Sequence, residues 1–274
     1  MTTDSRPAPA LAPRSLLFLP ASNPRAIEKA RGLAADMIFL DLEDAVKDDA
    51  KAEARAAAVA AVAQGFGGRP VAIRINVIGS AWHDEDVAAA AGSAVDYVIL
   101  PKAETPEEVD RVATGAGKPL LAMIETPRGV LAAAAIGALP CVAGLIAGTN
   151  DLRAQLKLPA EAPRTSLTHA LQAIVLAARA GGCWASDGVY NRLDDADGFA
   201  DECRDGRLLG FDGKTLIHPS QVDPCNTLFG PTEAEIADAR ALIAAATGGA
   251  ERFEGRMIEG MHVDTARALL ARLA

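Results

Sequence analysis

The stretch YVILPKAETPEEVDRVATGAGKPLLAMIETPR, residues 97–128, contains one full repeat of the pattern that decides the fold. Its apolar runs Tyr97–Leu100 and Leu120–Ile124 are typical of parallel strands that are covered on both faces. Between them, Thr105–Glu108 reads TPEE, which supplies a helix N-cap, a proline in the first turn and two acidic residues near the helix N-terminus. The stretch therefore predicts a strand, a helix and a second, parallel strand.

The same alternation extends over most of the chain. The apolar runs that predict strands are Ser15–Leu19, Met37–Leu40, Val71–Ile75, Tyr97–Leu100, Leu120–Ile124, Leu145–Ala147, Cys183–Ser186 and Thr215–Ile217. Helical patterns begin at Asn23-Pro24 and cover Asp48–Val62, Ser166–Ala180 and Thr232–Ala246. Eight such units predict closure into a (β/α)₈ TIM barrel, which needs about 250 residues. A doubly wound open sheet is the alternative, and the lack of a glycine-rich dinucleotide fingerprint after the first strand disfavours it.

The chain of 274 residues is predicted to have three parts. Residues 1–13 are rich in proline and alanine and predict a flexible tail. Residues 14–250 form the catalytic barrel, and residues 251–274 form a C-terminal loop and helix beyond what eight units require. This extension could cover the barrel or the site of a neighbouring subunit.

Composition narrows the class of protein. A formal net charge of −9 argues against nucleic-acid binding, although a local arginine or bound cation can still attract an anionic substrate. No apolar run is long enough to span a membrane, and no signal peptide is predicted. The four cysteines form no CxxC pair, so we expect reduced thiols in a cytoplasmic protein.

Polar side chains follow nearly every predicted strand, where a TIM barrel carries its active site. They are Asp41, Glu43, Asp44, Arg74, Asn76, Lys102, Glu125, Arg128, Asn150, Asp151, Asp187 and His218. Glu125 and Asp151 end neighbouring strands, so their carboxylates can approach each other and share Mg²⁺, which favours carboxylate and water ligands. Alternatively, each carboxylate pairs with a nearby arginine, such as Arg128 or Arg153.

Three other residues have two interpretations each. Arg74 lies inside an apolar strand, where a guanidinium could bind a substrate carboxylate or oxyanion, or could pair structurally with Glu43 or Asp44. Lys102 could form a Schiff base, but an electrostatic or structural role fits better beside two carboxylates. His218 is either a donor to substrate or a structural histidine after the last strand.

Together these residues resemble the citrate lyase β-subunit and malyl-CoA lyase family within the HpcH/HpaI aldolase group. The motifs are RSLLFLP (Arg14–Pro20), FLDLEDAV (Phe39–Val46), IRIN (Ile73–Asn76), LPKAET (Leu100–Thr105), MIETPRGV (Met123–Val130), AGTNDL (Ala147–Leu152), LGFDGKTLIHPSQV (Leu209–Val222) and GRMIEG (Gly255–Gly260). Each motif is weak alone, but together they run in order over nearly the whole chain.

The resemblance implies a homotrimeric or homohexameric barrel with Mg²⁺ on Glu125 and Asp151. It implies that Arg74 and Glu125 contact the acid substrate, and that Lys102, Glu43 and Asp44 support the site or position water. The implied reaction is reversible cleavage of a 3-hydroxyacyl-CoA, such as citryl-CoA or malyl-CoA. Its products are an acetyl-CoA-type thioester and a 2-oxo acid, and no organic cofactor is required.

Two departures from the family pattern refine this expectation. Glu259 stands where several acyl-CoA-cleaving members carry a catalytic aspartate, and its side chain is one methylene longer. The opening PASNPR (Pro20–Arg25) differs from the Gly-Asn-Arg-Pro of citrate lyase subunits, which favours a stand-alone enzyme. Arg14 and Arg25 are expected near the mouth, within reach of CoA phosphates. The alternatives are a metal-dependent aldolase that acts on free 2-oxo acids, or a non-catalytic acid-binding homologue.

Overall fold

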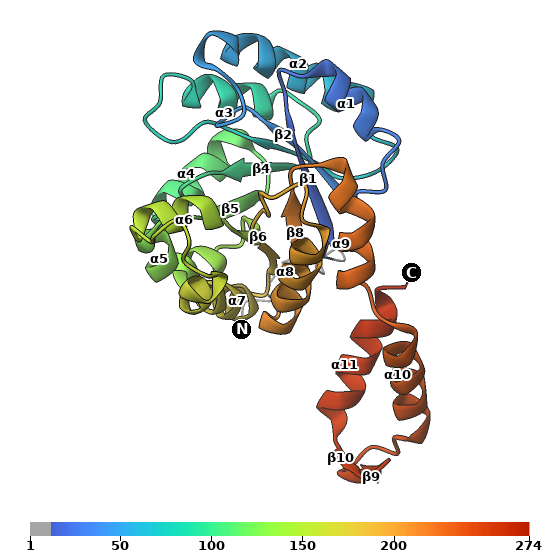
Figure 1. Ribbon diagram of the computed structural model, residues 1–274. Coiled ribbons are helices and arrows are strands. Elements are labelled where there is room, and N and C mark those ends of the chain that lie inside the picture. The colour runs from blue at the N-terminus through green and yellow to red at the C-terminus, as the bar shows by residue number, and fades with distance from the viewer. Residues whose placement is uncertain (1–11, 274) are drawn as a thin grey trace. The chain divides into compact units, whose positions relative to one another are not determined.

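The computed structural model describes residues 12–273 and contains a closed barrel of eight parallel strands in sequence order (Figure 1). The strands are β1 (Ser15–Pro20), β2 (Met37–Asp41), β3 (Val71–Arg74), β4 (Tyr97–Leu100), β5 (Leu120–Ile124), β6 (Val142–Ala147), β7 (Trp184–Asp187) and β8 (Gly213–Leu216). β1 pairs with both β2 and β8, which closes the ring. The predicted TIM barrel is therefore confirmed, and the open sheet is wrong.

Helices follow the strands and surround the barrel (Figure 1). Up to Phe229 the helices are α1 (Pro24–Ala30), α2 (Lys51–Gln64), α3 (His83–Ala91), α4 (Pro106–Ala116), α5 (Pro127–Gly137), α6 (Thr149–Gln155), α7 (Thr168–Gly181), α8 (Ala196–Leu209) and α9 (Val222–Phe229). Short 3₁₀ turns are η1 (Asp48–Ala50), η2 (Arg164–Leu167) and η3 (Pro219–Gln221). Thr105 and Thr126 cap α4 and α5 by accepting the backbone N–H of Glu108 and of Gly129. Both helices then start with proline, so their N-termini were readable from sequence.

Alternate residues of the strands fill the barrel interior. Its buried cluster comprises Leu16, Met37, Phe39, Ala72, Ile99, Leu121, Met123, Ile146 and Trp184. The indole of Trp184 fits only because its neighbour on β6 is a glycine, since a Cβ on Gly144 would lie 2.5 Å from the indole ring. Large and small side chains on adjacent strands thus complement each other, as close packing requires.

The last two strands begin and end at different residues from those predicted. β7 includes Asp187, and β8 begins at Gly213 and includes Lys214, although both charged side chains are wholly buried. Asp187 and Lys214 are directly opposite each other in the sheet, and Lys214 Nζ lies 2.8 Å from Asp187 Oδ2. Apolar periodicity cannot reveal a strand position where two buried charges compensate each other. The expectation that Asp187 joins the polar groups of the mouth is therefore wrong.

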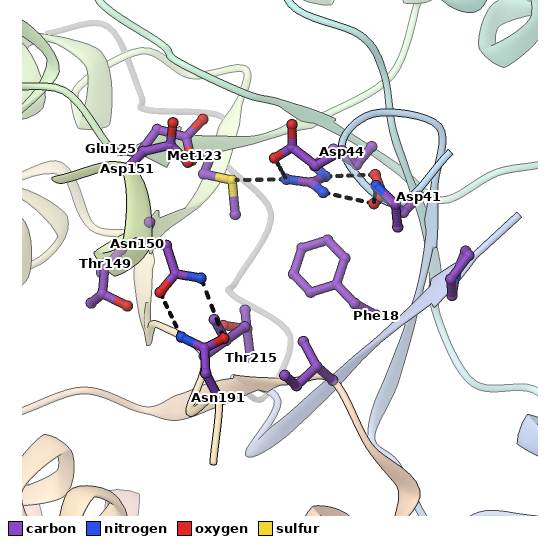
Figure 2. A pocket seen from close by; sticks show the side chains of 17 residues that line it. Phe18, Asp41, Asp44, Met123, Glu125, Thr149, Asn150, Asp151, Asn191 and Thr215 are labelled. Carbon is purple, nitrogen blue, oxygen red and sulfur yellow. Dashed lines mark hydrogen bonds and ion pairs between the residues drawn. The ribbon is translucent and has the colours of Figure 1, made fainter. Parts of the chain in front are cut away.

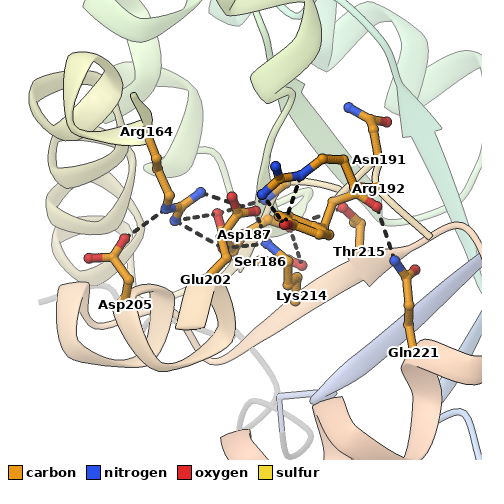
Figure 3. Close-up of polar contacts among 12 residues, drawn as sticks. Arg164, Ser186, Asp187, Asn191, Arg192, Glu202, Asp205, Lys214, Thr215 and Gln221 are labelled. Carbon is orange, nitrogen blue, oxygen red and sulfur yellow. Dashed lines mark hydrogen bonds and ion pairs between the residues drawn. The ribbon is translucent and has the colours of Figure 1, made fainter. Parts of the chain in front are cut away.

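This buried pair belongs to a larger ionic network (Figure 3). Arg164 of η2 donates to both carboxylate oxygens of Asp187 at 3.0 Å, and Lys214 also lies 2.7 Å from Glu202 Oε1 of α8. Burial alone would raise the pKa of Asp187, but Lys214 and Arg164 outweigh burial and hold the pKa below its usual value. The network joins η2 and α8 to the strands beneath them.

A second compact unit begins at Thr227. Its helices α10 (Glu233–Ala245) and α11 (Gly260–Ala271) pack together around Ala239, Leu242, Ile258 and Ala266, and β9 (Glu251–Phe253) pairs with β10 (Arg256–Ile258). The predicted extension starts at residue 251, whereas this unit also includes α10, whose apolar face contacts α11.

The predicted tail, residues 1–13, lies almost entirely outside the described residues. Within the described part of the chain, no helix is long and apolar enough to cross a membrane.

We predict that Asp187→Asn lowers the free energy of unfolding by about 3 to 5 kcal/mol, because it leaves buried cations without their shared carboxylate. Urea unfolding followed by circular dichroism would measure this loss. Asp201→Asn is the matched control: its side chain is 79% exposed in an ion pair with Arg204, so stability should hardly change. Equal unfolding midpoints for Asp187→Asn and wild type would contradict the assigned network.

The same comparison has a predicted pH dependence. Because the folded-state pKa of Asp187 is lowered, its contribution to stability is present at neutral pH and is lost as the pH falls below the usual aspartate value of about 4. The difference in the free energy of unfolding between wild type and Asp187→Asn should therefore become smaller at acidic pH.

Candidate active site

A cavity of about 350 Å³ opens at the C-terminal ends of the barrel strands (Figure 2). Its ionisable lining residues are Asp41, Asp44, Arg74, Glu125 and Asp151; its other polar ones include Thr149, Asn150, Asn191 and Thr215; and its larger apolar ones are Phe18, Met123, Val189 and Ile217. The structure thus brings Arg74, Glu125 and Asp151 to one cavity, at the end of the barrel where the sequence placed them.

Arg74 is oriented mainly by Asp41, a partner that the sequence analysis did not name. Its Nε and Nη2 donate to the two oxygens of Asp41 at 2.7 and 2.6 Å. Asp41 is the residue beside Arg74 in the β2–β3 register, so the end of the preceding strand was the available signal. The ring of Phe18 lies 4.9 Å from the guanidinium carbon and covers one face of the group.

The remaining nitrogen of Arg74 faces other acids. Nη1 lies 2.8 Å from Glu43 Oε2 and 3.6 Å from Asp44 Oδ2. Burial alone would lower the pKa of Arg74, but Asp41 and these acids raise it above its usual value. The predicted structural pairing of Arg74 with Glu43 or Asp44 therefore exists, but the bidentate contact of Arg74 is with Asp41. Arg74 is a fixed positive charge in the cavity wall.

The backbone after β4 and after β6 holds the Glu125 side chain in place. Its Oε1 accepts a hydrogen bond from the backbone N–H of Lys102 at 2.8 Å. Lys102 has a left-handed φ of 49°, an unfavourable conformation for a residue with a side chain and one that is common at functional sites. On the other side, a Cβ on Gly148 would lie 2.4 Å from Glu125 Oε2, so only glycine leaves room for this carboxylate.

The Lys102 side chain lies between two acids. Its Nζ is 3.3 Å from Asp151 Oδ1 and 3.5 Å from Glu43 Oε1. Burial alone would lower the pKa of Lys102, but the charges of Glu43, Glu125 and Asp151 raise it. A protonated lysine is a poor Schiff-base nucleophile, so this environment favours the electrostatic role.

Among the described residues, neither Arg128 nor Arg153 forms an ion pair with Glu125 or Asp151. Arg128 lies 3.8 Å from Glu104, and Arg153 donates to the carbonyl of Ala162. The alternative in which these arginines neutralise Glu125 and Asp151 is therefore wrong.

The electrostatics of Glu125 fit a cation site. Burial raises its pKa to about 8, and the charges of Glu43 and Asp151 contribute to the rise. Burial also raises the pKa of Glu43 to about 6. A hard divalent ion would stabilise the ionised forms, and one or two carboxylates with water and substrate oxygens are usual for Mg²⁺. Within residues 12–273 no group of three or more His, Cys, Asp or Glu side chains has the arrangement of a metal site.

Other predicted residues lie elsewhere. His218 is the N-cap of η3, with Nδ1 2.8 Å from Ser220 Oγ, and does not line the cavity. Arg14 precedes β1, at the opposite end of the barrel, and pairs with Asp36, so its expected place at the mouth is wrong. Arg25 lies on α1. Glu259 belongs to the second unit, where it is exposed and caps α11.

Asn191 and Thr215, which the sequence analysis missed, complete the wall together with Asn150. Asn191 follows β7 and links it to the start of α6, because its amide donates to Asn150 Oδ1 at 2.7 Å (Figure 2). Thr215 donates its hydroxyl to the backbone carbonyl of Asp187 at 3.0 Å. Thr215 lies within a quoted motif and on β8, so its membership of the motif was a usable signal.

The mouth of this parallel barrel holds buried acids, one arginine and two carboxylates that suit a cation. These features are typical of metal-dependent enzymes that act on small anionic substrates. Residues 14–219 match the family model described as HpcH/HpaI aldolase/citrate lyase. The chain belongs to this family, which consists of enzymes, and the resemblance seen in the sequence is confirmed.

Relatives and a solved structure agree with this assignment. The chain is 44% identical to a (3S)-malyl-CoA thioesterase of Cereibacter sphaeroides, with 94% of each chain covered. It is 36% identical to a citrate lyase subunit beta-like protein of Mycobacterium tuberculosis, over 93% of this chain and 94% of the relative. The crystal structure of the M. tuberculosis protein CitE with magnesium, acetoacetate and coenzyme A superposes with a TM-score of 0.82 at 34% identity, covering 96% of this chain and 98% of that one.

We predict that Gly148→Ala displaces the Glu125 side chain and weakens divalent-cation binding about 10-fold or more, because the added methyl group would lie only 2.4 Å from Glu125 Oε2. Isothermal titration with MgCl₂ would measure the affinity, and circular dichroism would verify the fold. Gly92→Ala is the control, since its nearest new contact is an ordinary 3.6 Å. Unchanged affinity in Gly148→Ala would show that the carboxylate does not depend on this gap.

Proposed function

We propose that this protein is a stand-alone Mg²⁺-dependent lyase that cleaves or forms a carbon–carbon bond in a 3-hydroxyacyl-CoA of the malyl-CoA or citryl-CoA type. Its products would be an acetyl-CoA-type thioester and a 2-oxo acid. The observation that carries the proposal is the placement of Glu125 and Asp151 with the fixed guanidinium of Arg74 around one cavity. The malyl-CoA and citrate lyase names of its relatives support this substrate class.

In this proposal Glu125 and Asp151 would hold Mg²⁺. A bound ion would supply a positive charge that stabilises the hydroxyl-derived oxygen as it becomes the carbonyl oxygen of the 2-oxo acid. Arg74 binds the acid and stabilises negative charge on its oxygens, and Asp41 keeps the guanidinium in that orientation. Because Arg74 is already fixed before substrate arrives, little reorganisation is needed as charge develops.

The cleavage involves two proton transfers. The substrate hydroxyl gives its proton to water in the site, and the O–H electron pair forms the carbonyl of the 2-oxo acid. The carbon–carbon bond breaks, its electron pair passes to the α-carbon of the thioester enolate, and that carbon then takes a proton. We assign this α-carbon proton to Glu259, in the place of the family aspartate, acting on the site of a neighbouring subunit. Glu43, Asp44 and Lys102 support the site or position water.

Hydrolysis of the thioester is the second candidate activity. It is favoured by the 44% identity to a protein named as a malyl-CoA thioesterase. The same cavity would hold the acid end of the acyl-CoA. Water would attack the thioester carbonyl, the carbon–sulfur bond would break, and the free acid and free CoA would be released. The assembly proposed with this function is a cytoplasmic homotrimer or homohexamer, in which each extension would act on the site of another subunit.

We predict that Glu125→Gln and Asp151→Asn each abolish measurable Mg²⁺ binding and lower turnover of malyl-CoA-type substrates at least about 100-fold, because each removes a metal ligand. Titration calorimetry and CoA-thioester assays would measure both effects. Excess EDTA should stop the wild-type enzyme, and Mg²⁺ should restore it. Glu107→Gln, an exposed change on α4, is the control. Full activity in EDTA would refute the mechanism.

We further predict that Glu259→Gln lowers carbon–carbon cleavage about 100-fold or more, the usual contribution of a general acid or base, and leaves binding of Mg²⁺ and a 2-oxo acid unchanged. Product analysis would separate 2-oxo acid formation from release of free CoA. Glu254→Gln, in the same unit, is the control. If Glu259→Gln cleaves at the wild-type rate, Glu259 has no role in proton transfer.

A further inference from the structure

Lys51 is a buried cation that neither the sequence motifs nor the proposed mechanism uses. It lies in the first turn of α2 and is 4% exposed. Its ammonium donates to the carbonyls of Leu42 and Glu43 at 2.8 and 2.7 Å and to Asn76 Oδ1 at 2.7 Å. All three ammonium hydrogens therefore have oxygen acceptors, and two of these acceptors are backbone atoms at the mouth of the barrel.

The third acceptor is itself fixed. The backbone N–H and the side-chain amide of Asn76 both donate to Asp86 Oδ2, at 2.9 and 2.6 Å. Asp86 is in turn held by Arg55 Nε at 2.7 Å. Because the Asn76 amide nitrogen is committed to Asp86, its oxygen must face Lys51. The ring of Trp82, 5.2 Å from the ammonium, closes this environment.

Lys51 thus anchors the backbone that carries Glu43. The Glu43 side chain leaves this anchored segment toward the site, where it lies 2.8 Å from Arg74 and 3.5 Å from Lys102. Lys102 is also 3.3 Å from Asp151. If Glu43 moved away, Lys102 would be left to pair with Asp151 alone and would compete with a cation for that carboxylate.

The geometry points to Lys51 as a positioning residue for the metal site: through the backbone of Leu42 and Glu43, it holds the Glu43 carboxylate where it shares the Lys102 ammonium and keeps Asp151 available. This inference rests on the proposed function, because it assumes that Asp151 and Glu125 bind Mg²⁺. It adds a residue outside the cavity to the determinants of cation affinity.

The test is a double-mutant cycle with Mg²⁺ affinity as its readout, measured by titration calorimetry with MgCl₂ alone. Lys51→Met keeps an unbranched side chain one atom shorter and removes the donors. Lys51→Met and Glu43→Gln should each weaken Mg²⁺ binding about 10-fold, a usual effect of residues that support metal ligands. The double variant should be no weaker than Glu43→Gln, because both changes act through one carboxylate. Lys47→Met, on the exposed turn before η1, is the matched control and should bind as wild type does.

The outcomes separate the two proposals. Wild-type protein that binds no Mg²⁺ would refute the proposed function and this inference with it. If wild type binds Mg²⁺, then equal affinity in Lys51→Met, or additive losses in the double variant, would overturn the positioning role alone. A purely structural role for Lys51 would lower the melting temperature without changing affinity at a temperature where the variant is folded. If Lys51→Met does not fold, Lys51→Gln, which retains two donors, enters the same cycle with the same criteria.

Discussion

The crowding of carboxylates at one mouth of the barrel is the constraint on which the rest of the site depends. Asp41, Glu43, Glu125 and Asp151 are drawn together there, and Asp41, Glu43 and Glu125 are almost completely buried. Such a group is unfavourable unless cations compensate it. Arg74 compensates Asp41 and Glu43, and Lys102 is shared between Glu43 and Asp151. Glu125 keeps a raised pKa and has no basic side chain paired with it among the described residues. The charges of Lys102 and Arg74 only partly offset burial and the neighbouring acids, which makes Glu125 suitable for a divalent ion.

The backbone contributes as much to this arrangement as the charges do. The left-handed turn at Lys102 aims its N–H at Glu125, and Gly148 leaves the space that the carboxylate occupies. The loop after β2 curls back so that the oxygens of Asp41 also accept the N–H groups of Glu43 and Ala45. These contacts fix the acids before any ligand arrives, which is the condition for preorganised electrostatic stabilisation. Small residues and turns at strand ends therefore belong to the chemistry of the site as well as to the fold.

Buried charge has a different use beside β7 and β8 of the same barrel. There the cations Arg164 and Lys214 are matched by the carboxylates of Asp187 and Glu202, and none of these four residues lines the cavity. This network connects η2 and α8 to β7 and β8, and the Thr215 hydroxyl of the cavity wall bonds to the backbone of Asp187. A compensated cluster thus supports structure, whereas the cluster around Glu125 retains excess negative charge that a ligand can use.

The sequence by itself determined the barrel, because eight apolar runs separated by helices leave few other ways to bury both faces of each strand. It also determined which end of the barrel carries Glu125, Asp151 and Arg74, since residues that follow parallel strands must emerge on one side. Only the tertiary structure decided which charged side chains pair. Asp41 accepts hydrogen bonds from Arg74, and Asp187 forms a buried ion pair with Lys214. Lys51 donates to the backbone carbonyl of Glu43. Periodicity reports which face a residue occupies, but the pairing of charges depends on register and distance between segments far apart in the chain. Those quantities exist only once the strands have closed into a ring.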